Sequence, residues 1–431
     1  MSDSQIIEAD LTWIDGAFLP GVRVAVANGV ITEVGALDAA PTRRLSGRAL
    51  LPGYVNAHSH AFQRGLRGLG EHFPAGSGSF WTWREAMYDL VASMDEERLT
   101  ALCVGAFEEM LAAGMTTVGE FHYLHHDATG AVFRFDEVVL AAAARAGIRI
   151  VLLNAVYAMG GFDSPLTGGQ KRFATPDLDA YWTQMERLGE IVDGDLARLG
   201  AVAHSLRAVS IEDIARIREE AERRHLVMHL HLEEQPQEIK DCVDRHGKTP
   251  MALLNEQVDI GPTLTAVHCT HSAAADLEEY LDRGGNVCLC PLTEANLGDG
   301  IADVPRMLKR PGQLALGSDS NARIDMLEEM RLLEYGQRLR GQHRGVCLDA
   351  SGRVGACLLE AATHGGARAL GLRTGAIRPT HLADLQSIDL QHPQLAGSTA
   401  ETLADALVLG AGSRVITEVC VGGVWRPIGA P

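Results

Sequence analysis

The chain has 431 residues, of which 46% are hydrophobic and 22% are charged, an ordinary globular composition with room for a large core and a smaller unit beside it. Its 38 basic and 56 acidic residues give a formal net charge of −18. This balance argues against nucleic acid or an anionic membrane surface as a partner, because both bind basic patches. Any anionic ligand must therefore be held by a few local arginines.

The start of the chain, MSDSQIIEAD, lacks a basic region followed by an apolar one, so we expect no signal peptide. No apolar stretch approaches the ~20 residues that cross a bilayer. Eight cysteines are scattered at irregular spacing, which is typical of reduced thiols in a cytoplasmic protein. Cys288 and Cys290 are close enough to be metal ligands, but we expect them to lie on a buried strand.

The two ends of the chain carry the same β pattern. GVRVAVANGVITEVG (residues 21–35) alternates on both sides of Asn28-Gly29, which is typical of a type I′ hairpin, and SRVITEVCVGGVWRP (residues 413–427) does the same around Gly422-Gly423. We therefore predict that residues 1–50 and 376–431 form one small composite domain, a β-sandwich.

Residues 51–375 change to short apolar runs separated by helical patterns such as EERLTALCVGAFEEMLAAG. The eight runs are ALLPGYVNAHSH, TTVGEFHY, RIVLLNAVY, RLGAVAHS, LVMHLHLEE, LTAVHCTH, NVCLCPLT and LALGSDS. Eight strand–helix units over roughly 320 residues predict an α/β fold, a (β/α)₈ barrel of the TIM type. GEHFPAGSGSF (residues 70–80) is expected to form a loop over the barrel mouth.

Polar residues gather at the C-terminal ends of these runs, where barrels of this class place their functional groups. They are His58 and His60, Glu120 and His122, His204, His229 and His231, His268 and His271, and Asp319. Alternate residues of a strand point to one face, so His58 and His60 both face the barrel axis.

Three imidazoles and a carboxylate around an open position make a catalytic site of the zinc type. We assign His58, His60, His231 and Asp319 as the metal ligands. His229, which lies deeper than His231 on the same face, is assigned to support or packing.

This pattern of histidines on strands one, five and six with an aspartate on strand eight resembles the amidohydrolase superfamily, as does the split β domain. Two-metal members carry a bridging lysine, usually on strand four, but here no lysine occurs between Lys171 and Lys240. The resemblance therefore implies one divalent ion per subunit. Zn²⁺ is the default, and iron or manganese are alternatives.

One-metal members are mostly deaminases with His-x-x-Glu on strand five, and residues 231–234 read HLEE. A deaminase must take a proton from the attacking water and give one to the leaving nitrogen, which a carboxylate between them can do. The resemblance implies that Glu234 is this acid, that His268 orients the water or polarises the carbon, and that Asp319 takes the first proton. Glu234 could instead begin the next helix, and His271 could replace His268.

Further segments resemble the branch of the superfamily that hydrolyses N-formimino-L-glutamate to N-formyl-L-glutamate and ammonia in histidine breakdown. They are HSHAFQRGLRGL, SFWTWREAMY, GEFHYLHHD, HSLRAVS, LTEANLGDG and GSDSNARIDMLEEMRLLEYGQRL. The resemblance implies a cytoplasmic homodimer with a small dicarboxylate substrate.

Two carboxylates call for arginines, and Arg84 and Arg207 lie in suitable loops. The cationic formimino group calls for acids, which Glu234 and Asp319 supply. The resemblance adds Gln63, Tyr123 and His204 to the pocket. Arg84 could instead pair with Glu85 or cap its helix.

Two other interpretations remain open. The same chemistry could act on N-formimino-L-aspartate or another amidine-bearing dicarboxylate, because one methylene changes binding by only ~1–3 kcal/mol. A non-catalytic metal-binding barrel would need the four ligands, but it would have no use for Glu234 and His268.

Overall fold

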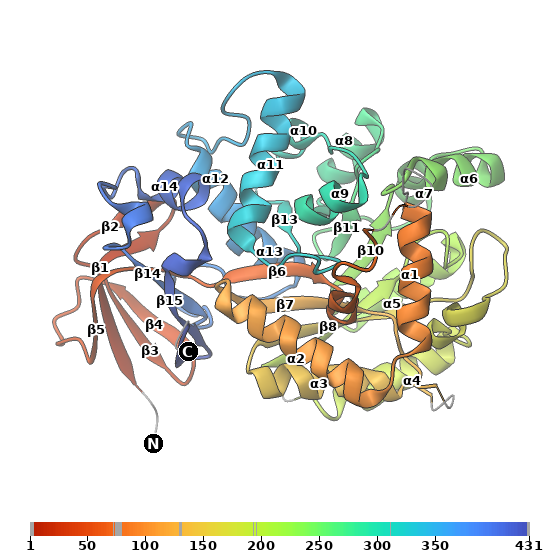
Figure 1. Ribbon diagram of the computed structural model, residues 1–431, viewed down its shortest axis with the longest axis horizontal. Helices are drawn as coiled ribbons and strands as arrows, with labels where there is room; N and C mark the ends of the chain where they lie inside the picture. The colour runs from red at the N-terminus through yellow and green to blue at the C-terminus, as the bar shows by residue number, and fades with distance from the viewer. Residues whose placement is uncertain are drawn as a thin grey trace.

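The computed structural model describes residues 4–71, 73, 80–128, 132–192, 194, 196–310 and 312–428. Within these residues, eight parallel strands form one sheet in which each strand pairs with the next along the chain (Figure 1). The strands are β6 (Tyr54–Ser59), β7 (Met115–His122), β8 (Arg149–Val156), β9 (Ala197–Ala203), β10 (Met228–Leu232), β11 (Leu264–His268), β12 (Asn286–Leu289) and β13 (Leu314–Leu316). They match the eight predicted runs.

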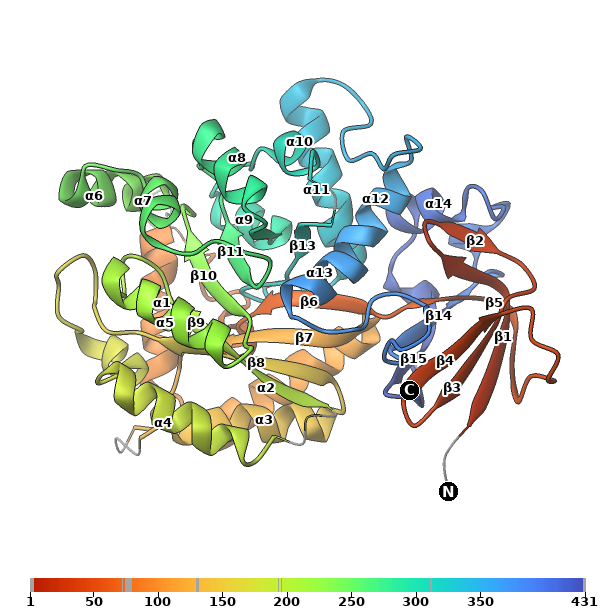
Figure 2. The same ribbon diagram turned by 180° about the vertical axis from the view of Figure 1, so that it is seen from behind.

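Helices alternate with these strands and lie around the outside of the sheet (Figure 2). They are α1 (Phe80–Ala92), α2 (Glu96–Ala112), α3 (Arg134–Ala146), α4 (Leu178–Gly189), α5 (Ile211–Arg223), α6 (Pro236–His246), α7 (Pro250–Gln257), α8 (Ala274–Asp282), α9 (Pro291–Leu297), α10 (Val304–Met307), α11 (Met326–Gly341), α12 (Val354–Glu360) and α13 (Gly366–Ala369). A further helix, α14 (Leu403–Gly410), follows the barrel in the chain and lies beside the second sheet (Figure 1). The predicted TIM-type barrel is therefore confirmed.

The barrel closes where the last strand meets the first. The backbone N–H groups of Ser318 and Asp319, which follow β13, both donate to the carbonyl of His58 on β6, at 3.0 Å. The N–H of His60 donates back to the carbonyl of Asp319 at 2.9 Å. Gly317 permits this approach, since a Cβ there would lie 2.7 Å from both the Cβ and the carbonyl oxygen of His58. The seam thus holds predicted metal ligands of both strands against each other.

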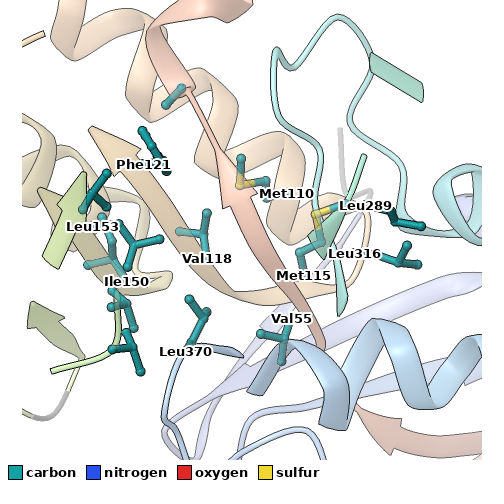
Figure 3. Close-up of a cluster of buried hydrophobic side chains, with 14 of the residues drawn as sticks. Val55, Met110, Met115, Val118, Phe121, Ile150, Leu153, Leu289, Leu316 and Leu370 are labelled. Carbon is teal, nitrogen blue, oxygen red and sulfur yellow. The ribbon is translucent and has the colours of Figure 1, made fainter. Parts of the chain in front are cut away.

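A continuous apolar core supports the barrel wall. Figure 3 shows side chains from β6, β7, β8, β12 and β13 gathered with Met110 of α2 and with Leu370, which follows α13. Val118 and Leu370 are each almost fully buried in this cluster. Burying such side chains contributes roughly 1.5–3 kcal/mol each, so the strand ends that carry polar groups rest on a rigid base.

The remaining strands form a second sheet from the two ends of the chain, which lie side by side in Figures 1 and 2. They are β1 (Gln5–Ile14), β2 (Ala17–Leu19), β3 (Arg23–Ala27), β4 (Val30–Gly35), β5 (Arg43–Pro52), β14 (Leu385–Asp389), β15 (Ile416–Val421) and β16 (Val424–Pro427). β5 joins the two halves, because it pairs in parallel with β1 and antiparallel with β14. All these strands are hydrogen-bonded in one continuous sheet.

Both predicted hairpins are present. Asn28 and Gly29 have φ values of 52° and 74°, and Gly422 and Gly423 have φ values of 56° and 83°. Positive φ at both central residues is what a type I′ turn requires, so these turns match the twist of the strands that they join.

Other expectations concern the thiols, the membrane and one loop. The eight cysteines are free thiols. Cys288 lies on buried strand β12, as expected, whereas Cys290 is buried but directly follows that strand, at the start of α9. Among the described residues, no helix is both long enough and apolar enough to cross a bilayer. Of the predicted loop 70–80, residues 72 and 74–79 lie outside the described residues.

A buried ion pair joins the barrel to the second sheet. Arg149 at the start of β8 donates from Nε to Asp384 Oδ2 at 2.6 Å and from Nη2 to Oδ1 at 3.0 Å. Thr374 Oγ1 and the backbone N–H of Gly422 donate to the same carboxylate, at 3.1 and 2.8 Å. Asp384 therefore gathers donors from the barrel strand, the C-terminal hairpin and the connection between them.

We expect Asp384→Ala to lower the free energy of unfolding by about 3–5 kcal/mol, because it leaves a buried guanidinium without its anion. Urea denaturation followed by circular dichroism measures this. Arg378→Ala is the matched control, since its ion pair with Asp15 is exposed and should matter far less. Equal effects of the two substitutions would contradict the assigned importance of the buried pair.

Candidate metal centre and active site

A cavity of about 220 Å³ opens at the C-terminal ends of the barrel strands. Every predicted site residue except His58 lines it, namely His60, Gln63, Arg84, Tyr123, His204, Arg207, His231, Glu234, His268 and Asp319. His58 lies beneath the cavity floor and is fully buried. The barrel topology thus brings together residues that are spread over more than half of the chain.

Four predicted ligands converge on one point. His58 Nε2 and His60 Nε2 each lie 3.3 Å from His231 Nε2, and each also lies 3.3 Å from Asp319 Oδ1. All four residues are buried. This is the arrangement that the HSH segment, strand five and strand eight were predicted to make.

The hydrogen bonds of two of these histidines determine which ring nitrogen carries the proton. His60 Nδ1 donates to the carbonyl of Phe121 at 2.7 Å, and His231 Nδ1 donates to the carbonyl of His204 at 3.1 Å. Their Nε2 atoms therefore present lone pairs to the centre of the cluster. Burial lowers the pKa of His60 to about 3 and the pKa of His231 well below its ordinary value, so both rings are neutral, as metal ligands must be.

The donor set fits a divalent cation. Ligands about 2.0–2.1 Å from Zn²⁺ at the corners of a tetrahedron lie roughly 3.3–3.4 Å apart, which matches the four distances above. Neutral imidazole lone pairs and a carboxylate would repel one another at this spacing unless a cation lay between them. The residues present therefore suit a metal of the zinc type.

Lys171 and Cys290 are two other potential ligands of this centre. Lys171, the lysine nearest in sequence to strand four on its N-terminal side, is exposed in the loop after β8 and stays outside the cluster. Cys290 lies close to His268 and Asp319, but burial raises the pKa of its thiol well above the ordinary value. A protonated thiol is a poor ligand, so His58, His60, His231 and Asp319 remain the better set.

The predicted proton-transfer groups border this centre. His268 Nε2 lies 3.9 Å from Glu234 Oε1 and 3.8 Å from Asp319 Oδ2, whereas Asp319 Oδ1 faces the metal-ligand histidines. Burial raises the pKa of Glu234, although the charges of His268 and Arg207 oppose the rise. For His268, burial lowers the pKa, but Glu234, Glu294 and Asp319 outweigh burial and raise it to about 10.

The backbone at the strand ends is bent to aim these side chains. His268 and Asp319 have φ values of 76° and 46°, and Glu233 has a φ of 55°. This left-handed region is costly for side chains other than glycine and often marks functional sites. At Glu233 the turn separates two adjacent acids: Glu233 accepts from the N–H of Met251 at 2.9 Å, while Glu234 lines the cavity.

Two arginines, Arg84 and Arg207, supply positive charge in the cavity lining. The side chain of Arg207 is 14% exposed, with its Nη2 3.8 Å from Glu234 Oε2 and its Nε 3.8 Å from Glu238 Oε2. Burial lowers the pKa of Arg207, but Glu238 and Glu234 outweigh burial and raise it, so the guanidinium stays charged. Arg84 donates from Nε to the hydroxyl of Tyr88 at 2.6 Å, one helical turn further along α1.

The other predicted pocket residues pack against the metal ligands. Gln63 donates to the hydroxyl of Tyr123 at 2.6 Å, and the Tyr123 ring contacts the rings of His60 and His204 edge-on, with centroids 5.0 and 5.2 Å apart. The His204 carbonyl orients His231, as described above. These contacts make the pocket wall continuous with the metal centre.

Several residues of this region were not identified from the sequence. Tyr157 and Tyr88 line the cavity, and Glu294 accepts from His268 Nδ1 at 3.3 Å. Tyr157 directly follows strand β8, so the strand-end rule could have found it. Glu294 directly follows the predicted run NVCLCPLT and lies five residues beyond the end of β12, on a helix whose direction no local pattern reveals.

His122 and His125 are both buried. His125 Nδ1 lies 2.8 Å from Asp136 Oδ1 on α3, and His122 Nε2 lies 3.2 Å from the same atom. Asn154 and Gln184 each donate to the other carboxylate oxygen, at 2.8 Å. This polar cluster anchors the loop that carries Tyr123.

Comparison with known proteins agrees with this geometry. Residues 49–426 match the model of the amidohydrolase family. Formimidoylglutamate deiminase of Pseudomonas aeruginosa is 38% identical over 406 residues, which cover 93% of this chain and 89% of that protein.

Two solved structures are also similar. An amidohydrolase from Brucella melitensis superposes with a TM-score of 0.90 at 32% identity, covering 99% of this chain and 95% of that one. An adenosine deaminase from Xanthomonas campestris with bound zinc superposes with a TM-score of 0.82 at 27% identity, covering 98% and 92% of the two chains.

We expect His231→Gln to weaken metal binding by more than the ~10–100-fold that loss of a supporting hydrogen bond costs, because it removes a converging lone pair. His229→Gln is the matched control: His229 lies two residues earlier on β10 and its Nε2 donates to the carbonyl of Ala369 at 2.9 Å. Metal analysis of both purified variants measures the difference. Full metal content in His231→Gln, or equal loss in both, would contradict the assigned ligand set.

Proposed function

The chain belongs to the amidohydrolase family, and from this premise we propose that it is a metal-dependent iminohydrolase that converts N-formimino-L-glutamate and water to N-formyl-L-glutamate and ammonia. The observation that carries the proposal is that groups of both charges line one cavity. The cations are Arg84 and Arg207, and the acids are Glu234 and Asp319 beside the metal centre. A substrate with two carboxylates and a cationic formimino group carries the complementary charges. The similarity to formimidoylglutamate deiminase of Pseudomonas aeruginosa supports the same substrate.

The metal centre would hold a single divalent ion, with Zn²⁺ as the proposed species. When bound, such an ion acts as a Lewis acid that lowers the pKa of water and makes it nucleophilic at neutral pH. His58, His60, His231 and Asp319 would hold the ion at the floor of the cavity. Among the described residues, no lysine is placed to bridge a second ion, which supports a mononuclear centre.

Proton transfer is the task of the acids around this centre. Water that attacks the formimino carbon must lose a proton, and Asp319 Oδ2, which faces the cavity side, is positioned to accept it. His268 Nε2 lies beside both Asp319 and Glu234, so it can orient the attacking oxygen or stabilise charge that develops on it. Glu234 then delivers a proton to the departing nitrogen, which leaves as ammonia.

The balance of protons favours Glu234 for the second step. Its buried position raises its pKa, which favours the protonated acid that must donate to a more basic amine nitrogen. Collapse of the tetrahedral intermediate breaks the bond from carbon to the terminal nitrogen. The remaining hydroxyl proton passes to the Glu234 carboxylate that this donation leaves, so the attacking oxygen becomes the carbonyl oxygen of the formyl group.

Arginines would position the substrate by its carboxylates. A guanidinium can bind a carboxylate through two parallel hydrogen bonds, which fixes direction as well as charge. Arg207 lies beside Glu234, so a carboxylate that binds it remains close to the proton donor. Tyr123, His204 and Gln63 supply further polar groups on the wall near His60.

The homologue N-formimino-L-aspartate remains the second candidate substrate, because its charges are the same and its chain is one methylene shorter. A purely metal-binding barrel is disfavoured, since it has no use for Glu234 and His268, and both line the cavity with the metal ligands.

We expect rapid ammonia release from N-formimino-L-glutamate, several-fold slower release from N-formimino-L-aspartate, and loss of both after removal of metal with a chelator. A coupled ammonia assay that gives kcat/KM for the two compounds measures this, and restored activity after Zn²⁺ addition is the control for chelator damage. No release from either compound by metal-loaded protein would exclude the proposed substrates.

We expect Glu234→Gln to lower kcat by about 10²–10⁴-fold while metal stays bound, because the amide cannot shuttle a proton. Glu233→Gln is the matched control: it changes the adjacent buried acid, which points away to Met251, and burial raises the pKa of Glu233 to about 7, so the amide resembles its protonated form. Steady-state kinetics and metal analysis of both variants provide the measurement. Near wild-type turnover by Glu234→Gln would rule out its assigned role.

A further inference from the structure

Glu294 is a buried acid that the proposed reaction does not use. It lies on α9 within the segment LTEANLGDG, and only 5% of it is exposed. Its Oε1 lies 3.3 Å from Nδ1 of His268, on the side of the ring opposite to the one that faces Glu234 and Asp319. The imidazole is therefore enclosed by carboxylates at both nitrogens.

The start of α9 fixes the carboxylate of Glu294. The backbone N–H of Cys290, the residue before the helix, donates to the same Oε1 atom at 3.0 Å. Backbone N–H groups at a helix start have no partner within the helix, and the helix dipole favours an anion there. Glu294 is thus held by main-chain structure of β12 and α9, independently of solvent.

Support of this kind matters because the orientation of the His268 ring depends on its neighbours. The residue lies at the last position of β11 with a φ of 76°, and Cys269 after it has a φ of 52°. Its ring is stacked against His231, with centroids 5.5 Å apart and planes 14° from parallel. Stacking restricts the plane of the ring but not which nitrogen faces the cavity.

Because a carboxylate can only accept, the hydrogen bond to Glu294 requires a proton on Nδ1 and directs Nε2 toward the reaction centre. We propose that Glu294 is a positioning residue that sets the ring orientation of His268 and thereby keeps Nε2 between Glu234 and Asp319. This inference rests on the proposed function, in which His268 acts on the attacking oxygen. Glu294 itself does not touch the substrate.

A purely structural role in capping α9 is the competing explanation, and the chain offers a matched control for it. Glu329 on α11 is also fully buried, and its Oε2 accepts from the N–H of Leu292 at 2.9 Å, in the same first turn of α9. Burial raises the pKa of Glu329 well above its ordinary value, so a glutamine resembles its protonated form. Within the described part of the chain, the hydrogen bond of Glu329 goes to α9 and not to His268.

The test compares Glu294→Ala, Glu294→Gln and Glu329→Gln in the metal-loaded enzyme. We expect Glu294→Ala to lower kcat by about 10–100-fold, the usual effect of losing a supporting partner, with KM within about threefold and metal content unchanged. Glu294→Gln should recover kcat several-fold relative to alanine, because an amide oxygen can accept the same two hydrogen bonds and preserves the fold. Glu329→Gln should keep kcat within about twofold.

A crystal structure of the metal-loaded Glu294→Ala variant gives a readout that does not depend on the substrate. We expect the His268 ring to turn or to become disordered there, while His231 keeps its position. An unchanged ring, a kcat within twofold of wild type in Glu294→Ala, or the same loss in Glu329→Gln would overturn the proposal. If the wild-type protein does not act on N-formimino-L-glutamate, the proposed function fails, but the ring orientation still decides the role of Glu294.

Discussion

The seam between β6 and β13 is the constraint on which the metal centre depends. His58 and Asp319 are separated by most of the chain, yet the carbonyl of His58 accepts from the N–H groups of Ser318 and Asp319. The side chain of Asn56 strengthens the seam, because it donates to Ser318 Oγ at 2.7 Å and accepts from the Ser318 N–H at 2.9 Å. Closure of the barrel therefore also brings together the two strand ends that carry His58, His60 and Asp319.

At the C-terminal end of the barrel, burial and neighbouring groups decide which histidines are neutral and which are charged. Burial lowers the pKa of His58, His60 and His231, the predicted metal ligands, and so favours their neutral rings. The outer nitrogens of His60 and His231 donate to backbone carbonyls. His268 keeps its proton because three acids face it. Thus one kind of side chain serves two purposes within a few ångströms, and the difference arises from the partners of each ring.

The same local control of charge bears on how an acidic protein could bind the proposed dicarboxylate substrate. The net charge of −18 belongs to the whole chain, and solvent and salt screen exposed charges, whereas the Arg207 side chain is only 14% exposed in the cavity wall. Glu238 and Glu234 lie 3.8 Å from its guanidinium and raise its pKa, so the guanidinium stays charged. In the proposed function this guanidinium binds a substrate carboxylate, and the acids serve the cationic end.

Much of this organisation was present in the sequence. Periodicity determined the eight strands, the two hairpins and the TIM-type fold, because period-two alternation and strand-end polarity are local properties. HSH at a strand end and HLEE on strand five indicated a metal centre with a neighbouring acid, since residues two apart on a strand must face the same way. The dense motifs also indicated the amidohydrolase family, which the similarity over nearly the whole chain confirms.

Only the tertiary structure decided contacts between distant segments. Glu294 belongs to the site because α9 turns toward His268, and no spacing in the sequence encodes that direction. The resemblance selected Glu234 rather than Glu233, but the physical reason appears only in the structure, where a positive φ at Glu233 sends that acid to α7 and leaves Glu234 in the cavity. The sequence by itself determined which residue types stand at the strand ends. The packing of the barrel decided which of their atoms meet, because distances between segments far apart in the chain depend on closure and not on local periodicity.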